Sequence, residues 1–201
     1  VAETSRPAAR GKDASFSALQ GGVGMASTTV VLPGSDDHVI VAALAVVNAV
    51  GSVIDESTGR PWYPIPGVRR PSGADRAQLR AALAAARPAP LNTTIGVVAT
   101  DAGLGRTQAG RLALAAHDGL ARAVRPSHAL TDGDTVFALA TGRHDLSHGA
   151  ESLTAEHVVA LDLLAAAAAE VFAAACTDAV VHATTVGDAP AYADLCPSAY
   201  R

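Results

Sequence analysis

The dipeptide Asn92-Thr93 is the part of the sequence with the clearest potential for covalent chemistry. It lies between a Pro-rich run, ARPAPLN, and a β-branched segment, TTIGVVATD. A threonine hydroxyl at such a junction can attack the preceding carbonyl and form an ester, and water then releases a new N-terminus at Thr93. The freed amine can serve as base for the same hydroxyl, because an α-amino group with a pKa of about 7.7–8.0 is partly neutral near pH 7. A purely structural interpretation is that the pair begins a strand, where β-branched residues are common.

Three further polar side chains lie at the ends of apolar runs. Asn48 follows HVIVAALAVV, where an asparagine often caps a turn. Asp132 and Asp134 flank a glycine before the run TVFALATG, which is also typical of an Asp-Gly turn. Residues two apart around a glycine can point to one side when the first lies in the turn. The two carboxylates can therefore share one site.

Neither a metal nor an organic cofactor is predicted. His144 and His148 have the spacing of two zinc ligands on one helix, but Asp145 stands where a zinc protease has glutamate, and the Gly- and Ser-rich surroundings favour a loop. The segment GVGMAS does not complete a dinucleotide fingerprint. Cys176 and Cys196 form no metal motif and are expected to be reduced and buried, with a single disulfide as the alternative.

The elements that position these residues can be predicted from periodicity and from breakers. A Gly-rich turn at 20–27 is expected to lead into a strand at 28–32, and further strands are expected at 38–48, 93–100 and 134–142. Helices are expected at 74–86, at 105–124 and from an N-cap at Thr154 to about 176, with Thr177-Asp178 capping a further helical piece. Residues 1–18 are interpreted as a linker, 33–37 as a turn, 52–73 as irregular surface and 143–152 as a loop.

This order of elements, together with apolar strands and helices rich in small residues, predicts a layered α/β sandwich. The 201 residues are 49% hydrophobic and 17% charged, which is a globular composition for a single domain, 1–201. Aromatic residues are only 3%, so the core is expected to pack through alanine and close backbone approach.

The composition also bears on partners and location. A net charge of −4 provides no broad basic surface for nucleic acid. The apolar stretch 158–176 contains Asp162 and Glu170, which a membrane span would rarely carry, so a buried helix of a soluble protein is expected. No signal peptide precedes it. We therefore expect a cytoplasmic protein without a membrane partner.

Several motifs occur in the order seen in one enzyme family. The segments QGGVGMAS and VVNAVGSVIDESTGRPW precede the run NTTIGVVATDAGLGRTQAGRLALAAHDGLARAVRPSHALTDGDTVFALATG. Together they resemble the family of DmpA-type D-/L-aminopeptidases, which includes β-peptidyl aminopeptidases, the nylon-oligomer hydrolase and a pantetheine hydrolase. The resemblance runs from about residue 19 to residue 142, and the last fifty-odd residues share only helical character.

The resemblance implies a four-layer αββα sandwich like that of N-terminal-nucleophile hydrolases. It implies self-cleavage into chains 1–92 and 93–201, which stay together and assemble into an oligomer of heterodimers. Thr93 matches the nucleophile and Asn92 the last residue of the first chain. Asn48 matches the side-chain donor of the oxyanion hole, and Asp132 and Asp134 match the pair that orients the nucleophile and its amine. The implied substrate is a small peptide or another amide.

One position departs from the family pattern. Gln20-Gly21-Gly22 stands where the family commonly has Lys-Gly-Gly, and that lysine lies close to the nucleophile in relatives. Gln20 keeps hydrogen bonding but loses the charge. The chain also has no match to the family's N-terminal portion, which supplies strands and part of the substrate pocket. An alternative function is therefore a weakened or inactive relative that acts as an assembly or binding module.

Overall fold

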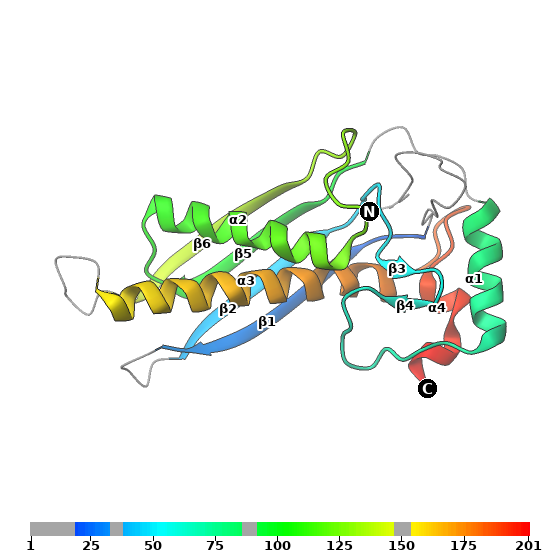
Figure 1. Cartoon of the computed structure of the whole chain (residues 1–201), viewed down its shortest axis with the longest axis horizontal. Helices are drawn as coiled ribbons and strands as arrows, with labels where there is room; N and C mark the ends of the chain where they lie inside the picture. The colour runs from blue at the N-terminus through cyan, green and yellow to red at the C-terminus, as the bar shows by residue number, and fades with distance from the viewer. Residues whose placement is uncertain (1–18, 33–37, 86–91, 147–153) are drawn as a thin grey trace.

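A four-stranded sheet lies beneath two long helices in the computed structural model, which describes residues 19–32, 38–85, 92–146 and 154–201 (Figure 1). The strands are β1 (Val23–Val31), β2 (His38–Val46), β5 (Ile95–Ala102) and β6 (Thr135–His144), in the order β1-β2-β5-β6. β2 pairs antiparallel with both β1 and β5, whereas β5 pairs parallel with β6. The α/β class predicted from the sequence is confirmed.

One face of the sheet is covered by α2 (Arg106–Ala123) and α3 (Ala155–Val181), which lie side by side (Figure 1). α3 packs on β1 and β2, while α2 packs mainly on β6. α2 is the crossover that a parallel β5–β6 pair requires. Along β2, every second residue from Val39 to Val47 is buried, and this alternation is the period of a strand covered on one face.

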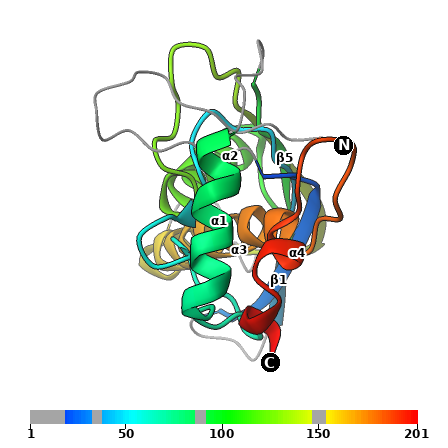
Figure 2. The same cartoon turned by 90° about the vertical axis from the view of Figure 1, so that its right-hand side faces the viewer.

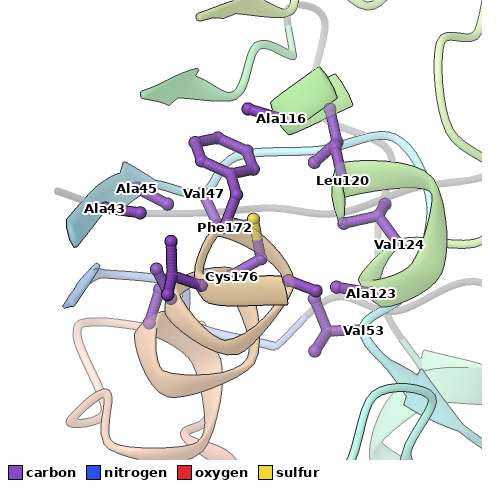
Figure 3. Close-up of a cluster of buried hydrophobic side chains, with 14 of the residues drawn as sticks. Ala43, Ala45, Val47, Val53, Ala116, Leu120, Ala123, Val124, Phe172 and Cys176 are labelled. Atoms are coloured by element: carbon purple, nitrogen blue, oxygen red, sulfur yellow. The ribbon is translucent and has the colours of Figure 1, made fainter. Parts of the chain in front are cut away.

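Small side chains bring the two helices close together, as the composition predicted. A Cβ added to Gly119 of α2 would lie 2.2 Å from the Ala169 carbonyl oxygen of α3, so only glycine fits there. Figure 3 shows how Phe172 and Cys176 of α3 lie beside Leu120 of α2 at the centre of this core. Phe172 is one of only three phenylalanines in the chain, and its ring lies over Gly96 of β5.

α3 is the most apolar element, and two predictions about it have different outcomes. The N-cap at Thr154 is confirmed, because its hydroxyl accepts a hydrogen bond of 3.2 Å from His157 N–H. The further helical piece expected to begin at Thr177-Asp178 is wrong, since α3 continues unbroken to Val181. The Thr177 hydroxyl donates to the Tyr63 carbonyl, 3.0 Å away, rather than capping a new helix. By length and composition alone this helix could also cross a membrane, but core helices pass the same test.

The start of β1 differs from the prediction. A turn was expected at 20–27, but the strand already begins at Val23. Gly24 does not break the strand because α3 crosses directly over it, and a Cβ there would lie 2.1 Å from the Ala175 carbonyl oxygen. The glycine is therefore explained by close packing rather than by a turn.

A smaller subregion lies at one end of the sheet (Figure 2). Three helical elements lie here: α1 (Gly73–Ala85), α4 (Tyr192–Leu195) and the C-terminal 3-10 helix η1 (Pro197–Tyr200). The segment expected to be irregular contains a short hairpin of β3 (Ile54–Asp55) and β4 (Arg60–Pro61). Ser72 caps α1 by accepting a 3.1 Å bond from Asp75 N–H, and Asp75 in turn accepts a 2.9 Å bond from Ser198 N–H. These contacts attach α1 to the C-terminal segment.

The opposite face of the sheet is apolar and open. Cross-strand neighbours on this face include Met25, Leu44 and Phe137, and Met25 is 68% exposed. Large side chains exposed here are Val23, Met25, Val31, Ile40, Leu44, Ile95, Phe137 and Leu139. Four layers require a second sheet on this face, and the described residues supply one sheet layer and one helical layer. Contiguous exposed apolar patches are typical of interaction surfaces.

The remaining predictions concern histidine and cysteine. His144 ends β6 rather than lying in a loop, because the strand continues through a bulge at which it pairs with Ala102. His148 lies outside the described residues, as do the predicted linker 1–18 and turn 33–37. Cys176 and Cys196 are buried and are not joined by a disulfide, as predicted, and burial raises the pKa of Cys196 to about 12.

Candidate active site

The sheet topology brings the predicted site residues to one edge. β1, β5 and β6 begin at this edge and β2 ends there, because β2 runs opposite to the other three strands. Asn48 follows β2, Thr93 precedes β5, and Asp132 and Asp134 precede β6. An isolated parallel bridge between Asn92 and Asp132 extends the β5–β6 pairing to the site itself. Segments far apart in the sequence therefore meet around Thr93.

The Thr93 hydroxyl lies beside the carbonyl that it would attack. Its Oγ1 donates a hydrogen bond of 2.5 Å to the carbonyl oxygen of Asn92. The Thr93 backbone N–H donates to the Asn48 carbonyl oxygen at 2.6 Å. The peptide unit between Asn92 and Thr93 is thus held at both its nitrogen and its oxygen. An amine released at this nitrogen would begin with a hydrogen-bond acceptor already in place.

Asn48 is brought to Thr93, but the contact runs through its backbone. The sequence assigned its side-chain amide to an oxyanion hole, and that assignment stays a prediction. Asn48 is positioned because Val47 N–H donates to the Gly22 carbonyl at 3.1 Å, which joins the end of β2 to the start of β1. The backbone contact shows how the strand end supports the reacting segment.

Gly133 is a functional candidate that sequence reasoning missed. Its N–H donates to the Asn92 carbonyl oxygen at 3.2 Å, so a backbone donor faces the atom that would become an oxyanion. A Cβ at this position would lie 3.1 Å from Thr93 Oγ1, which leaves little room for any side chain. The signal was present in the sequence as the glycine of Asp-Gly-Asp, but a turn explained it equally well.

Asp132 and Asp134 lie close enough to interact, and each accepts a hydrogen bond from a backbone N–H. Asp134 Oδ1 accepts from Thr94 N–H at 2.9 Å, and Asp132 Oδ2 accepts from Val50 N–H at 3.0 Å. Burial raises the pKa of Asp132 to about 6, and the charge of Asp134 adds to this rise although the Val50 bond opposes it. Asp132 is therefore a carboxyl that exchanges its proton near neutral pH, which suits a general base or acid.

Buried polar atoms without a partner gather around the same point. Within the described residues, no hydrogen bond reaches Asn92 Oδ1, Thr94 Oγ1 or Asp132 Oδ1. Burying an unpaired polar atom costs free energy, so such atoms are rare unless a ligand or water satisfies them. Two of these atoms belong to the residues that flank Thr93, and the third belongs to Asp132, which pairs with Asn92.

Gln20 is buried near the strand end that carries Asn48. Gln20 is only 2% exposed, and its side-chain Nε2 donates to the Gly21 carbonyl at 2.9 Å. Its backbone N–H donates to Pro190 at 2.8 Å. Burial of an uncharged amide is far less costly than burial of an ammonium group.

Comparison with known proteins places this geometry in context. Residues 9–191 match the sequence model of peptidase family S58. An uncharacterized aminopeptidase of Mycobacterium tuberculosis is 43% identical over 199 residues, which cover 94% of the chain and 56% of that protein. An uncharacterized aminopeptidase of Mycobacterium leprae is 42% identical over 191 residues, covering 90% and 50%. The chain therefore spans about half the length of these relatives.

Solved structures show the same architecture. A Burkholderia β-aminopeptidase superposes with a TM-score of 0.55 at 24% identity, over 90% of the chain and 50% of that protein. The L-aminopeptidase D-Ala-esterase/amidase of Ochrobactrum anthropi, described as a new variant of the Ntn hydrolase fold, gives a TM-score of 0.53 at 24% identity, over 84% and 42%. These likenesses confirm the predicted fold class, of which the described residues form two layers.

Proposed function

Because the chain belongs to peptidase family S58, the family of DmpA-type aminopeptidases and β-aminopeptidases, we propose that it is the nucleophile-bearing part of an amide hydrolase that activates itself. The cleavage point is the bond between Asn92 and Thr93, and Thr93 is afterwards the nucleophile. The observation that carries this proposal is the Asn92 carbonyl, which receives the Thr93 hydroxyl at 2.5 Å and the Gly133 N–H at 3.2 Å.

Self-cleavage begins when Thr93 Oγ attacks the carbonyl carbon of Asn92. The hydroxyl proton passes to Asp132, whose pKa of about 6 makes it a suitable acceptor near neutral pH. The carbon–nitrogen bond breaks, the Thr93 nitrogen takes up a proton, and an ester joins Asn92 to Thr93 Oγ. Water then adds to the ester, leaving a carboxylate on Asn92 and restoring the hydroxyl of Thr93.

The same groups then act on an external amide. The Thr93 amine takes the proton of its own hydroxyl as Oγ attacks the substrate carbonyl. Asn48 and Gly133 N–H donate to the developing oxyanion, and each such donor contributes about 2.7–4 kcal/mol to lowering the barrier. Asp132 and Asp134 orient the amine. The leaving amine departs with the proton, and water hydrolyses the ester on Thr93.

The rest of the assembly is inferred from the family. The substrate is a short peptide or another small amide, and the two self-cleaved chains, 1–92 and 93–201, stay together as one unit of a cytoplasmic oligomer. The open sheet face that bears Met25, Leu44 and Phe137 is covered by the part of the family fold that this chain does not match. That part also completes the substrate pocket.

Trapping the acyl intermediate tests the hydrolase function. The cleaved protein is mixed with an activated ester of a small amino acid, quenched in acid and weighed as separate chains. We expect the mass of one acyl group on the chain that begins with Thr93, and none on the single uncleaved chain of Thr93→Ala. Thr107→Ala, an exposed threonine on α2, is the matched control and should be acylated like the parent.

Acylation of the other chain, or equal acylation of the Thr93→Ala variant, would refute the assignment of the nucleophile. The non-catalytic alternative rests on Gln20 alone. A parent protein that is cleaved but takes up no acyl group and hydrolyses no peptide would favour that alternative instead.

A further inference from the structure

A histidine outside the proposed reacting groups is bonded directly to one of the site carboxylates. His128 Nδ1 lies 2.9 Å from Asp134 Oδ2. The Asp134 side chain is only 2% exposed and its other oxygen accepts from Thr94 N–H, so both oxygens of a buried carboxylate are engaged. The His128 side chain is 44% exposed and can exchange protons with solvent. The contact therefore connects solvent, through His128 and Asp134, to Thr94, the residue next to Thr93.

The backbone at His128 is held in a sparsely populated conformation. Its φ of 54° lies in the left-handed region, and it is the one non-glycine residue with positive φ in the described ranges. Such a conformation costs on the order of 1–3 kcal/mol, and it persists where surrounding contacts fix it, often at functional sites. The conformation directs the ring toward Asp134 and toward His117 of α2, whose ring centroid is 5.1 Å away.

The ring beside His128 on α2, His117, is partly buried and lies close to several charged groups. Burial lowers the pKa of His117, and the charge of His128 lowers it further, although Asp134 and Asp118 oppose the change. The lowered pKa favours the neutral form of His117, which packs against His128 through its ring. The groups that face His128 are His117 on α2 and the two carboxylates, Asp132 and Asp134. The nearby Arg125 guanidinium is directed elsewhere, 4.6 Å above the Trp62 ring.

We propose that His128 is a positioning residue of the Thr93 site: its ring holds one oxygen of Asp134 and so keeps the other oxygen on Thr94 N–H, beside Asp132. The inference rests on the proposed function of Thr93. Without the His128 ring, one oxygen of the buried Asp134 carboxylate loses its partner. The alignment of Thr94, and of Thr93 beside it, is then lost.

The test replaces the histidine without disturbing the backbone. Asn tolerates positive φ and keeps an amide donor but cannot carry charge, so His128→Asn isolates the charge. The assay follows self-cleavage rather than substrate hydrolysis. Before cleavage the Thr93 amine does not exist, so its titration cannot contribute to the pH–rate profile. The intact protein is made in an uncleaved state, transferred to a series of pH values, and the fragments are weighed over time.

We expect His128→Asn to slow self-cleavage by about 10- to 100-fold, the effect of losing a charge-assisted hydrogen bond. We also expect the acid limb of the pH–rate profile to move to higher pH, because the positive charge of His128 lowers the pKa of Asp132 in the parent. The matched control is His144→Asn, which removes another His–Asp contact, 3.6 Å from Asp101, at the end of β5 and β6 opposite to Thr93. Its rate and its acid limb should equal those of the parent.

A second variant guards against misfolding. His128→Gly suits the positive φ and leaves a half-exposed space, so added imidazole should restore self-cleavage in this variant but not accelerate the parent. A parent-like rate and acid limb in His128→Asn, or no rescue of His128→Gly by imidazole, would overturn the role of His128. A purely structural role would lower the melting temperature without moving the acid limb.

A last measurement separates this inference from the proposed function. In a Thr93→Ala background, which has no attacking hydroxyl, the Asp132 carboxyl carbon is titrated by NMR with and without His128→Asn. We expect the midpoint to rise when His128 is replaced, because the charge of His128 lowers the pKa of Asp132. An unchanged midpoint refutes the inference even if the parent cleaves itself. A parent that never cleaves refutes the proposed function but leaves this titration decisive for His128.

Discussion

Replacing Asp132 with asparagine should make the protein more stable and less active at the same time. The substitution keeps the shape of the side chain, and an amide oxygen can still accept the bond from Val50 N–H. In the parent, burial raises the pKa of Asp132 from its ordinary value of 3.8 to about 6. The folded state therefore disfavours the ionised form, which the uncharged amide avoids.

The magnitude and its pH dependence follow from proton linkage. A rise from 3.8 to about 6 corresponds to about 3 kcal/mol, which we reduce to about 1–2 kcal/mol because the group is partly exposed to solvent. Because the folded-state pKa is the higher one, the parent has this contribution below about pH 4 and loses it as the pH rises through 6. Asp132→Asn should therefore gain about 1–2 kcal/mol relative to the parent between pH 4 and pH 7.5.

Urea unfolding of Asp132→Asn and of its parent at both pH values measures this difference. Both proteins carry Thr93→Ala, so that no cleavage disturbs the transition. In a background with Thr93 intact, Asp132→Asn should slow self-cleavage by about 10²- to 10⁴-fold, the usual contribution of a general base. A stability difference that does not change between the two pH values would refute the raised pKa. Unimpaired self-cleavage would refute the role of Asp132 as proton acceptor.

Four further substitutions test other parts of the site and fold. Asn48→Asp, assayed on protein already cleaved at Thr93, should reduce amide hydrolysis by at least about 10²-fold with little change in thermal unfolding, and near-parent turnover would remove Asn48 from the oxyanion hole. Gly133→Ala should slow self-cleavage about tenfold by displacing the Thr93 hydroxyl, since small misplacements of reacting atoms are costly; an unchanged fragment-formation rate would contradict the close contact. Gln20→Lys should change the rate of processing or of turnover, and two unchanged rates would show that this position does not couple to Thr93. Gly24→Ala should lower the free energy of unfolding by about 1–3 kcal/mol or more, because its Cβ meets the backbone of α3 2.1 Å away; a parent-like denaturant midpoint would contradict that packing.

Much of the sheet could be predicted because its signals are local. The runs that became β2, β5 and β6 are apolar or β-branched and end at turn residues, so composition and breakers locate them to within a few positions. The resemblance added the order of the motifs and the candidate residues Asn48 and Thr93. Their meeting at one edge follows from the topology, since the parallel pair β5–β6 places both strand starts together.

The errors arose where a long-range contact overrides a local preference. Gly24 favours a turn, yet it lies inside β1, because α3 packs directly against its backbone where a side chain would not fit. Thr177 favours an N-cap, yet its hydroxyl is used by the Tyr63 carbonyl and the helix continues. No sequence pattern connects His128 with His117, because their contact depends on how the loop after α2 folds back.

The central claim is tested most directly by the intact mass of the purified protein under denaturing conditions. If Thr93 is released as an N-terminal nucleophile, the protein separates into one chain that ends at Asn92 and one that begins at Thr93, and Thr93→Ala remains a single chain. A single uncut parent chain, a break at any other bond, or normal cleavage of Thr93→Ala would contradict the account.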